Sequence, residues 1–142
     1  MFARILVAVA EAEDVEQTMA TVTALANLFG SEVLVFHARE RVVGPDDVEE
    51  QETIPQSQEY GERMAKRLED AGIKADVVVE SVRPNRLAEH ILAHANTVQA
   101  DLIVIGGHHP HNLRETVFGD IGKALVHGAR CPVMLMPSTA AR

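Results

Sequence analysis

Aromatic residues and cysteine are scarce in this sequence, and each scarcity argues against a class of function. Tryptophan is absent, and one tyrosine and four phenylalanines are spread over 142 residues, which leaves little surface for stacking bases. The one cysteine, Cys131, cannot form a disulfide within the chain. The amino terminus leads into an apolar run too short for a secretion signal or a membrane span. We therefore expect a cytoplasmic protein.

Positive charge is also in deficit. Thirteen Lys and Arg stand against twenty-one Asp and Glu, a formal net charge of -8, so a nucleic-acid backbone or an anionic membrane would repel the chain. Nine of the acidic residues lie in two stretches without Lys or Arg, residues 11–16 and 46–52. The negative charge is therefore concentrated in these two stretches, and we expect the binding of a polyphosphate to be disfavoured near them.

Short apolar runs alternate with longer stretches in which apolar residues recur every three or four positions, a pattern typical of a parallel sheet with helical crossovers. Strands are predicted at residues 4–9, 32–37, 74–80, 102–105 and 133–136. Helices are predicted between them, and Gly30 and Gly72 are expected to end the first two. We predict one doubly wound, three-layer α/β domain over residues 1–142, with five parallel strands and four helices.

Two segments interrupt this rhythm. Residues 38–54 contain the turn-forming run Gly-Pro-Asp-Asp and an acidic tail, so we predict a long surface loop, and residues 138–142 are expected to form a frayed tail. Ligands of such sheets bind beyond the carboxyl ends of the strands. The segments expected to form a site are therefore residues 10–14, 37–40 and 106–120.

Three segments carry a resemblance to a known family. Residues 5–9 (ILVAV), 100–108 (ADLIVIGGH) and 128–137 (GARCPVMLMP) resemble the universal stress protein family, and the likeness covers nearly the whole chain. The resemblance implies a five-stranded parallel sheet ordered 3-2-1-4-5. It also implies a homodimer paired through the last strand, here Pro132 to Pro137. One branch of the family binds ATP.

The ATP-binding branch carries a glycine motif after strand four, which this sequence keeps only in part. The matching positions are Gly106, His109, Gly119 and Asp120: the glycines keep their spacing, but His109 adds a ring and Asp120 a carboxylate that would repel phosphate. Ala10 stands where the family has an aspartate that helps hold the nucleotide. The resemblance thus implies a degenerate pocket, formed by Val9, Ala10, Ala38, Gly106, His108, His109, Gly119 and Asp120.

We therefore expect a non-catalytic stress-response protein with no cofactor. The alternative is an ATP-binding, slowly hydrolysing protein that uses Gly106 and Gly119. A third possibility is an uncharged adenosine-like or hydrophobic ligand in the same crevice.

Other candidate residues favour no further chemistry. His108, His109 and His111 show no known zinc spacing, so no metal site is predicted. His90 and His94 are interpreted as solvated helix residues, and Cys131 as a buried small hydrophobic residue. The serines lack a Gly-x-Ser-x-Gly elbow, which disfavours a hydrolase.

Overall fold

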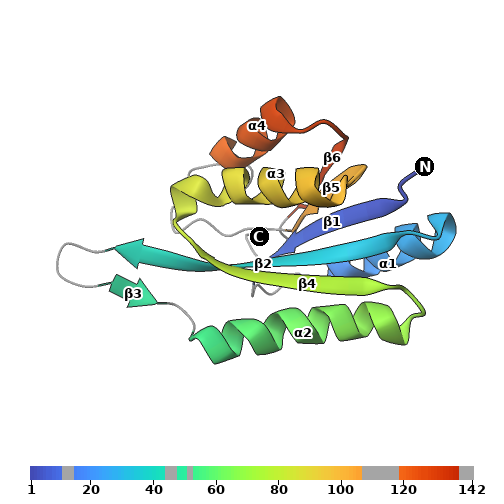
Figure 1. Cartoon of the computed structure of the whole chain (residues 1–142), viewed down its shortest axis with the longest axis horizontal. Coiled ribbons are helices and arrows are strands. Elements are labelled where there is room, and N and C mark those ends of the chain that lie inside the picture. The colour runs from blue at the N-terminus through green and yellow to red at the C-terminus, as the bar shows by residue number, and fades with distance from the viewer. Residues whose placement is uncertain (11–14, 44–47, 51–52, 107–118, 138–142) are drawn as a thin grey trace.

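The computed structural model describes residues 1–10, 15–43, 48–50, 53–106 and 119–137. Five parallel strands form its sheet: β1 (Arg4–Val9), β2 (Glu32–Val43), β4 (Ala75–Val82), β5 (Leu102–Ile105) and β6 (Val133–Leu135). They are arranged in the order β4-β2-β1-β5-β6 (Figure 1). Counted along the chain as parallel strands, this is the predicted order 3-2-1-4-5, which is confirmed.

Four helices cover the two faces of the sheet. α1 (Val15–Phe29) and α2 (Ile54–Asp70) lie on one face, and α3 (Leu87–Val98) and α4 (Gly119–Gly128) lie on the other (Figure 1). A short 3₁₀ turn, η1 (Pro84–Arg86), leads into α3. Two apolar clusters fill the space between the layers, one under α1 and α2 and the other under α3 and α4. The predicted three-layer domain with four helices is confirmed.

The central strands are buried on both faces, as their continuous apolar sequences predict. Every residue of β5 is buried, and so is β1 from Ile5 to Val9. Gly30 and Gly72 follow α1 and α2 with φ of 67° and 82°, the left-handed conformation that ends a helix at little cost for glycine. α2 begins with a capping box, in which Thr53 accepts from the Gln56 amide and Gln56 accepts from the Thr53 amide.

The prediction of a surface loop over residues 38–54 is wrong in part. β2 continues to Val43, and a short strand, β3 (Val48–Glu50), pairs antiparallel with its last three residues. The physical reason is that Val42, Val43 and Val48 favour extended backbone, and the Gly-Pro-Asp-Asp run between them favours a reversal of the chain. The last part of the segment is also not loop, because α2 begins at Ile54. The predicted tail at 138–142 lies outside the described residues.

Because β1, β2, β4 and β5 are parallel, their carboxyl ends point toward the same end of the sheet. β4 pairs with β2 along eight residues, up to Glu40 and Val82. In the part of the chain that the structure describes, no helix is long and apolar enough to cross a membrane.

Candidate functional site

A crevice opens at the carboxyl ends of β1 and β5 and beside the middle of β2, on the side of the sheet that α3 covers. The strand ends form its floor and the first two turns of α3 form a wall. Its lining residues, all apolar or glycine, are Ala8, Val9, Ala10, Phe36, Ala38, Leu87, Ile91, Ile105 and Gly106. No charged side chain belongs to this described lining.

Four of the eight residues predicted for the pocket line this crevice: Val9, Ala10, Ala38 and Gly106. Gly119 and Asp120 are the first two residues of α4, and the structure describes only their backbone. His108 and His109 lie outside the described residues, as does His111. The structure thus brings the described strand ends together as expected, while their role in binding stays a prediction.

Gly106 directly follows β5 and lies in a narrow space. Its amide donates to the Ala8 carbonyl at 3.0 Å. A Cβ at this position would meet Thr18 Oγ1 at 3.3 Å and the Ala8 carbonyl at 3.4 Å, tighter than side chains usually tolerate. Glycine therefore lets the chain leave β5 between α1 and the end of β1, directly beside the crevice.

Two side chains hold the end of β1 from the opposite face of the sheet. The His37 Nδ1 atom is hydrogen-bonded to the Val9 carbonyl at 2.9 Å, and the Tyr60 hydroxyl donates to the Ala10 carbonyl at 2.9 Å. The centroids of the His37 and Tyr60 rings lie 4.6 Å apart, and both residues are buried. The backbone that floors the crevice is therefore fixed by polar contacts from β2 and α2.

Sequence reasoning missed this role of His37 and Tyr60. In the sequence, Tyr60 recurs with Met64 and Leu68 at helical spacing and so predicts only a buried helix position, and His37 is only the last residue of a predicted strand. Their partners are main-chain carbonyls, which no side-chain motif encodes. The one available signal was that a histidine closing a buried strand needs a polar partner.

Arg39 was also missed. Its side chain is buried, and its Nη1 atom donates to Ser81 Oγ at 2.8 Å across the β2–β4 pair. A buried guanidinium requires polar partners because desolvation of a charge is costly. Arg39 thus belongs to the polar framework at the carboxyl ends of the strands and is not part of the crevice lining.

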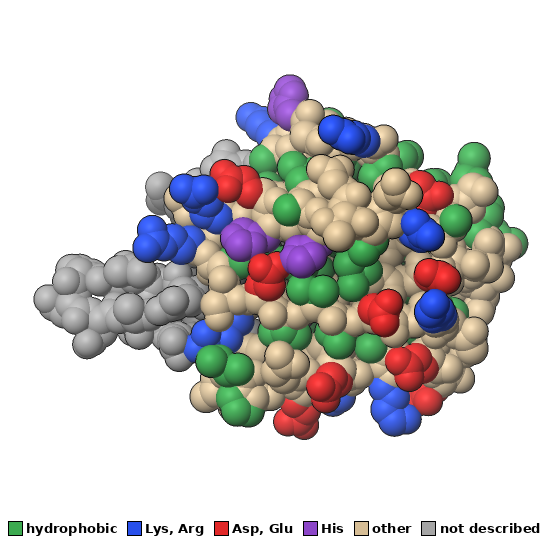
Figure 2. All heavy atoms as spheres, viewed as in Figure 1, with side chains coloured by type: hydrophobic (Ala, Val, Ile, Leu, Met, Phe, Trp, Pro, Cys, Tyr) green, Lys and Arg blue, Asp and Glu red, His purple; other side chains and the backbone are tan. Residues whose placement is uncertain are grey.

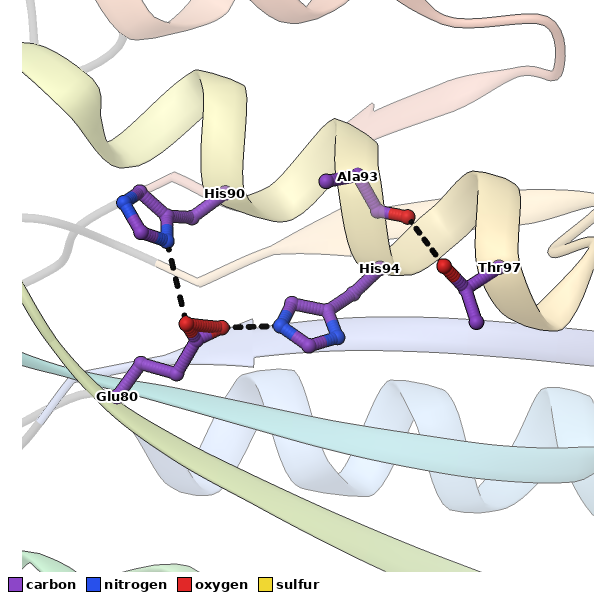
Figure 3. A network of polar contacts seen from close by, with 5 residues as sticks. All are labelled: Glu80, His90, Ala93, His94 and Thr97. Atoms are coloured by element: carbon purple, nitrogen blue, oxygen red, sulfur yellow. Dashed lines mark hydrogen bonds and ion pairs between the residues drawn. The ribbon is translucent and has the colours of Figure 1, made fainter.

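The prediction that His90 and His94 are solvated helix residues is wrong in part, because both are partly buried and share a partner on β4. Both imidazoles contact the Glu80 carboxylate on β4, through His90 Nδ1 to Oε2 at 3.2 Å and His94 Nε2 to Oε1 (Figure 3). Burial raises the pKa of Glu80, but the hydrogen bonds and charges of His94 and then His90 outweigh it and hold this pKa below its ordinary value. The prediction failed because Glu80 comes from a strand that only the fold brings beneath α3.

Cys131 is partly buried against the cluster under α3 and α4. Burial and the nearby charge of Asp101 raise the pKa of its thiol, against a smaller opposing effect of a backbone hydrogen bond. A raised pKa leaves little thiolate at neutral pH, so Cys131 is a poor nucleophile. Its predicted role as a small apolar residue agrees with this environment.

Comparison with known proteins places the chain in a family. The sequence matches the universal stress protein family over residues 1–137. The chain belongs to that family. Among curated proteins none matches the sequence.

Solved structures share the fold of this universal stress protein. A hypothetical protein solved as a test case of structural genomics is 22% identical, with a TM-score of 0.75 and 98% of both chains covered. A universal stress protein from Burkholderia pseudomallei is 19% identical, with a TM-score of 0.68 over 96% of this chain and 97% of its own. One from Archaeoglobus fulgidus in complex with dAMP is 24% identical, with a TM-score of 0.67 over 94% and 97%.

Proposed function

We propose that this universal stress protein is a non-catalytic, cytoplasmic stress-response homodimer whose crevice does not take ATP. The observation that carries the proposal is the crevice lining, whose described side chains are all apolar. A triphosphate brings several negative charges, which need cationic side chains, a metal ion or a row of amides to replace water. The apolar lining suits an uncharged adenosine-like or other apolar molecule better.

Two features of the chain support the same proposal. The residue at the end of β1 that meets the crevice is Ala10, where ATP-binding members carry an aspartate. Acidic residues crowd the segment that follows it, residues 11–16, and they would raise the cost of bringing phosphates near.

The proposal of a dimer rests on the edge strand β6. Among the described residues β6 pairs only with β5, so its outer backbone groups are open to another strand. Its three residues are partly buried. A twin β6 would complete both pairings through a two-fold axis.

Thermal melting tests the proposal on the crevice. A ligand at 100 times its Kd adds about 2.7 kcal/mol of stability, several degrees in a domain of this size. We expect no shift of Tm with millimolar Mg-ATP and no release of phosphate above the background rate.

The control variants are Ala38→Phe, which fills the crevice, and Ala24→Phe, at an exposed position of α1. A Tm shift with ATP that Ala38→Phe removes and Ala24→Phe retains would overturn the proposal. A shift with adenosine that follows this same pattern would identify the uncharged ligand.

ATP binding with slow hydrolysis is the second candidate function. It is favoured by the position of Gly106, which offers backbone at the crevice. It is also favoured by α4, whose first residue is the retained glycine Gly119, so that the amides of the first helical turn directly follow this glycine. The family relative solved with dAMP also supports a nucleotide in this fold. The ATP arm of the melting experiment distinguishes the two candidates.

A further inference from the structure

Three side chains outside the crevice join α3 to the edge strand β4. The Glu80 carboxylate lies between the imidazoles of His90 and His94, which project from successive turns of α3 (Figure 3). The side chains are partly exposed: 30% for Glu80, 36% for His90 and 28% for His94. Solvent protons can therefore reach all three. Figure 2 shows neighbouring histidine side chains beside an acidic side chain near the middle of this face.

The cluster of Glu80, His90 and His94 is mechanically connected to the crevice. Ile91 lies between the two histidines in the helix, is fully buried and forms part of the crevice wall. The centroid of the His94 ring lies 5.4 Å from that of Phe36, a residue that also lines the crevice. A displacement of this part of α3 relative to β4 would therefore move the crevice wall.

We propose that Glu80, His90 and His94 form a pH-sensitive latch that holds α3 against β4 and so controls the width of the crevice. The inference concerns the crevice of the proposed function, but it does not depend on which ligand binds there. The latch is closed when the carboxylate is ionised and an imidazole is protonated.

The charge states give the latch two limits. Imidazole is the side chain whose charge changes between pH 5 and 8, and an imidazolium donates a stronger hydrogen bond to a carboxylate than a neutral imidazole does. At the acid limit the carboxylate itself is neutralised. Because the pKa of Glu80 is lowered in the fold, its stabilisation is present above its ordinary pKa and is lost as the pH falls through the lowered value.

Other charged groups around the latch have partners of their own or are exposed. On α3, Arg86 and Glu89 pair with each other at 3.0 Å. On β2, Arg39 donates to Ser81 Oγ beside Glu80. On β4 the charged residues Asp76 and, just beyond the strand, Arg83 are exposed, and on the neighbouring α4 so are Lys123 and His127.

A metal ion is a different explanation for two histidines and a glutamate, and the geometry does not favour it. His90 and His94 approach different oxygens of the carboxylate rather than a common point. Among the described residues no group of three or more ligands is placed to hold a metal. The contacts are those of two imidazoles that each bond one oxygen of a shared carboxylate.

Amide hydrogen exchange of α3, referred to α2 in the same sample, tests the latch without a ligand. Between pH 6 and pH 9 we expect the relative protection of α3, corrected for intrinsic exchange rates, to fall about threefold, as for a partly exposed ion pair. The Ile91 methyl resonance should shift over the same pH range. Glu80→Gln keeps a hydrogen-bond acceptor but removes the charge, so both profiles should become flat at the high-pH level.

The matched control is Glu89→Gln, which removes an exposed carboxylate from the same helix and should leave both profiles unchanged. A flat profile in the unmodified protein, or a profile that Glu80→Gln leaves intact, overturns the latch. An Ile91 methyl that does not follow α3 overturns its link to the crevice. A profile abolished by EDTA would replace the latch with a metal site. Failure of both ATP and adenosine to bind would exclude these two ligands for the crevice and leave the latch result standing.

Discussion

Single polar side chains decide how the carboxyl end of β1 is held. The carbonyls of Val9 and Ala10 accept from His37 and Tyr60, so the crevice floor has its hydrogen bonds satisfied from the far side of the sheet. Thr18 is the exception nearby. Its Oγ1 atom is buried and has no hydrogen-bond partner among the described residues, so no contact with this part of the chain offsets the cost of its desolvation.

Replacing Thr18 by valine should therefore stabilise the protein. The side chain keeps its shape and loses a hydroxyl that no described residue pairs with, so the free energy of unfolding should rise by about 1 kcal/mol, measured by urea denaturation. Thr23→Val is the control, because its hydroxyl donates to the Met19 carbonyl at 2.7 Å on the same helix and its loss should bring no gain. A stability of Thr18→Val equal to or below that of the unmodified protein would refute this account.

The fit of α2 on β4 is decided at the scale of whole elements. The stripe of Tyr60, Met64 and Leu68 predicts the buried face of the helix, and the structure confirms that all three are buried. The distance of closest approach depends on Gly61 instead. A Cβ there would lie 2.7 Å from Val77 Cγ2 and 3.0 Å from Val79 Cγ2, so the helix rests directly on the strand.

Gly61→Ala sets two effects against each other. Alanine favours the helix by up to about 1 kcal/mol, but overpacking against stiff valines costs about 1–3 kcal/mol. We expect net destabilisation by about 1 kcal/mol, measured by chemical denaturation. The added change Val77→Ala creates room for the methyl group. The double variant should therefore lose less unfolding free energy than the two single variants lose in sum. Strict additivity would show that the two residues do not meet.

At the scale of the whole molecule, the sheet has two open edges. In the described part of the chain β4 and β6 each pair with one neighbouring parallel strand. β4 carries the charged residues Asp76 and Glu80, which discourage pairing with another strand, whereas β6 is uncharged (Val133–Leu135). This contrast favours β6 as the edge where two copies meet.

Leu135→Lys should accordingly convert the proposed dimer into monomers. A charge on a three-residue strand would have to be desolvated in a paired sheet, and light scattering should report half the mass. Circular dichroism confirms that the variant is folded, and Val126→Lys, at an exposed position of α4, is the control for added charge. A folded Leu135→Lys protein that remains dimeric would rule out this interface.

The sequence by itself determined most of the strands and helices, because these elements are encoded locally, and the order of the strands in the sheet came from the family resemblance. Apolar runs predicted the buried strands, three-to-four spacing predicted the helices, and Gly30 and Gly72 marked two helix ends. The rule that ligands bind beyond the carboxyl ends of parallel strands also located three crevice residues, Ala10, Ala38 and Gly106, and the resemblance added Val9.

Tertiary structure alone decided the contacts between residues distant in the chain. The extension of β2 and the pairing of β3 depend on backbone partners, and the Glu80–His90–His94 latch on a strand placed under a helix. The hydrogen bonds of His37 and Tyr60 are made to main-chain carbonyls, which every residue possesses and no sequence motif distinguishes. Side-chain patterns encode which surface an element buries, whereas polar partners are chosen only when the elements have packed.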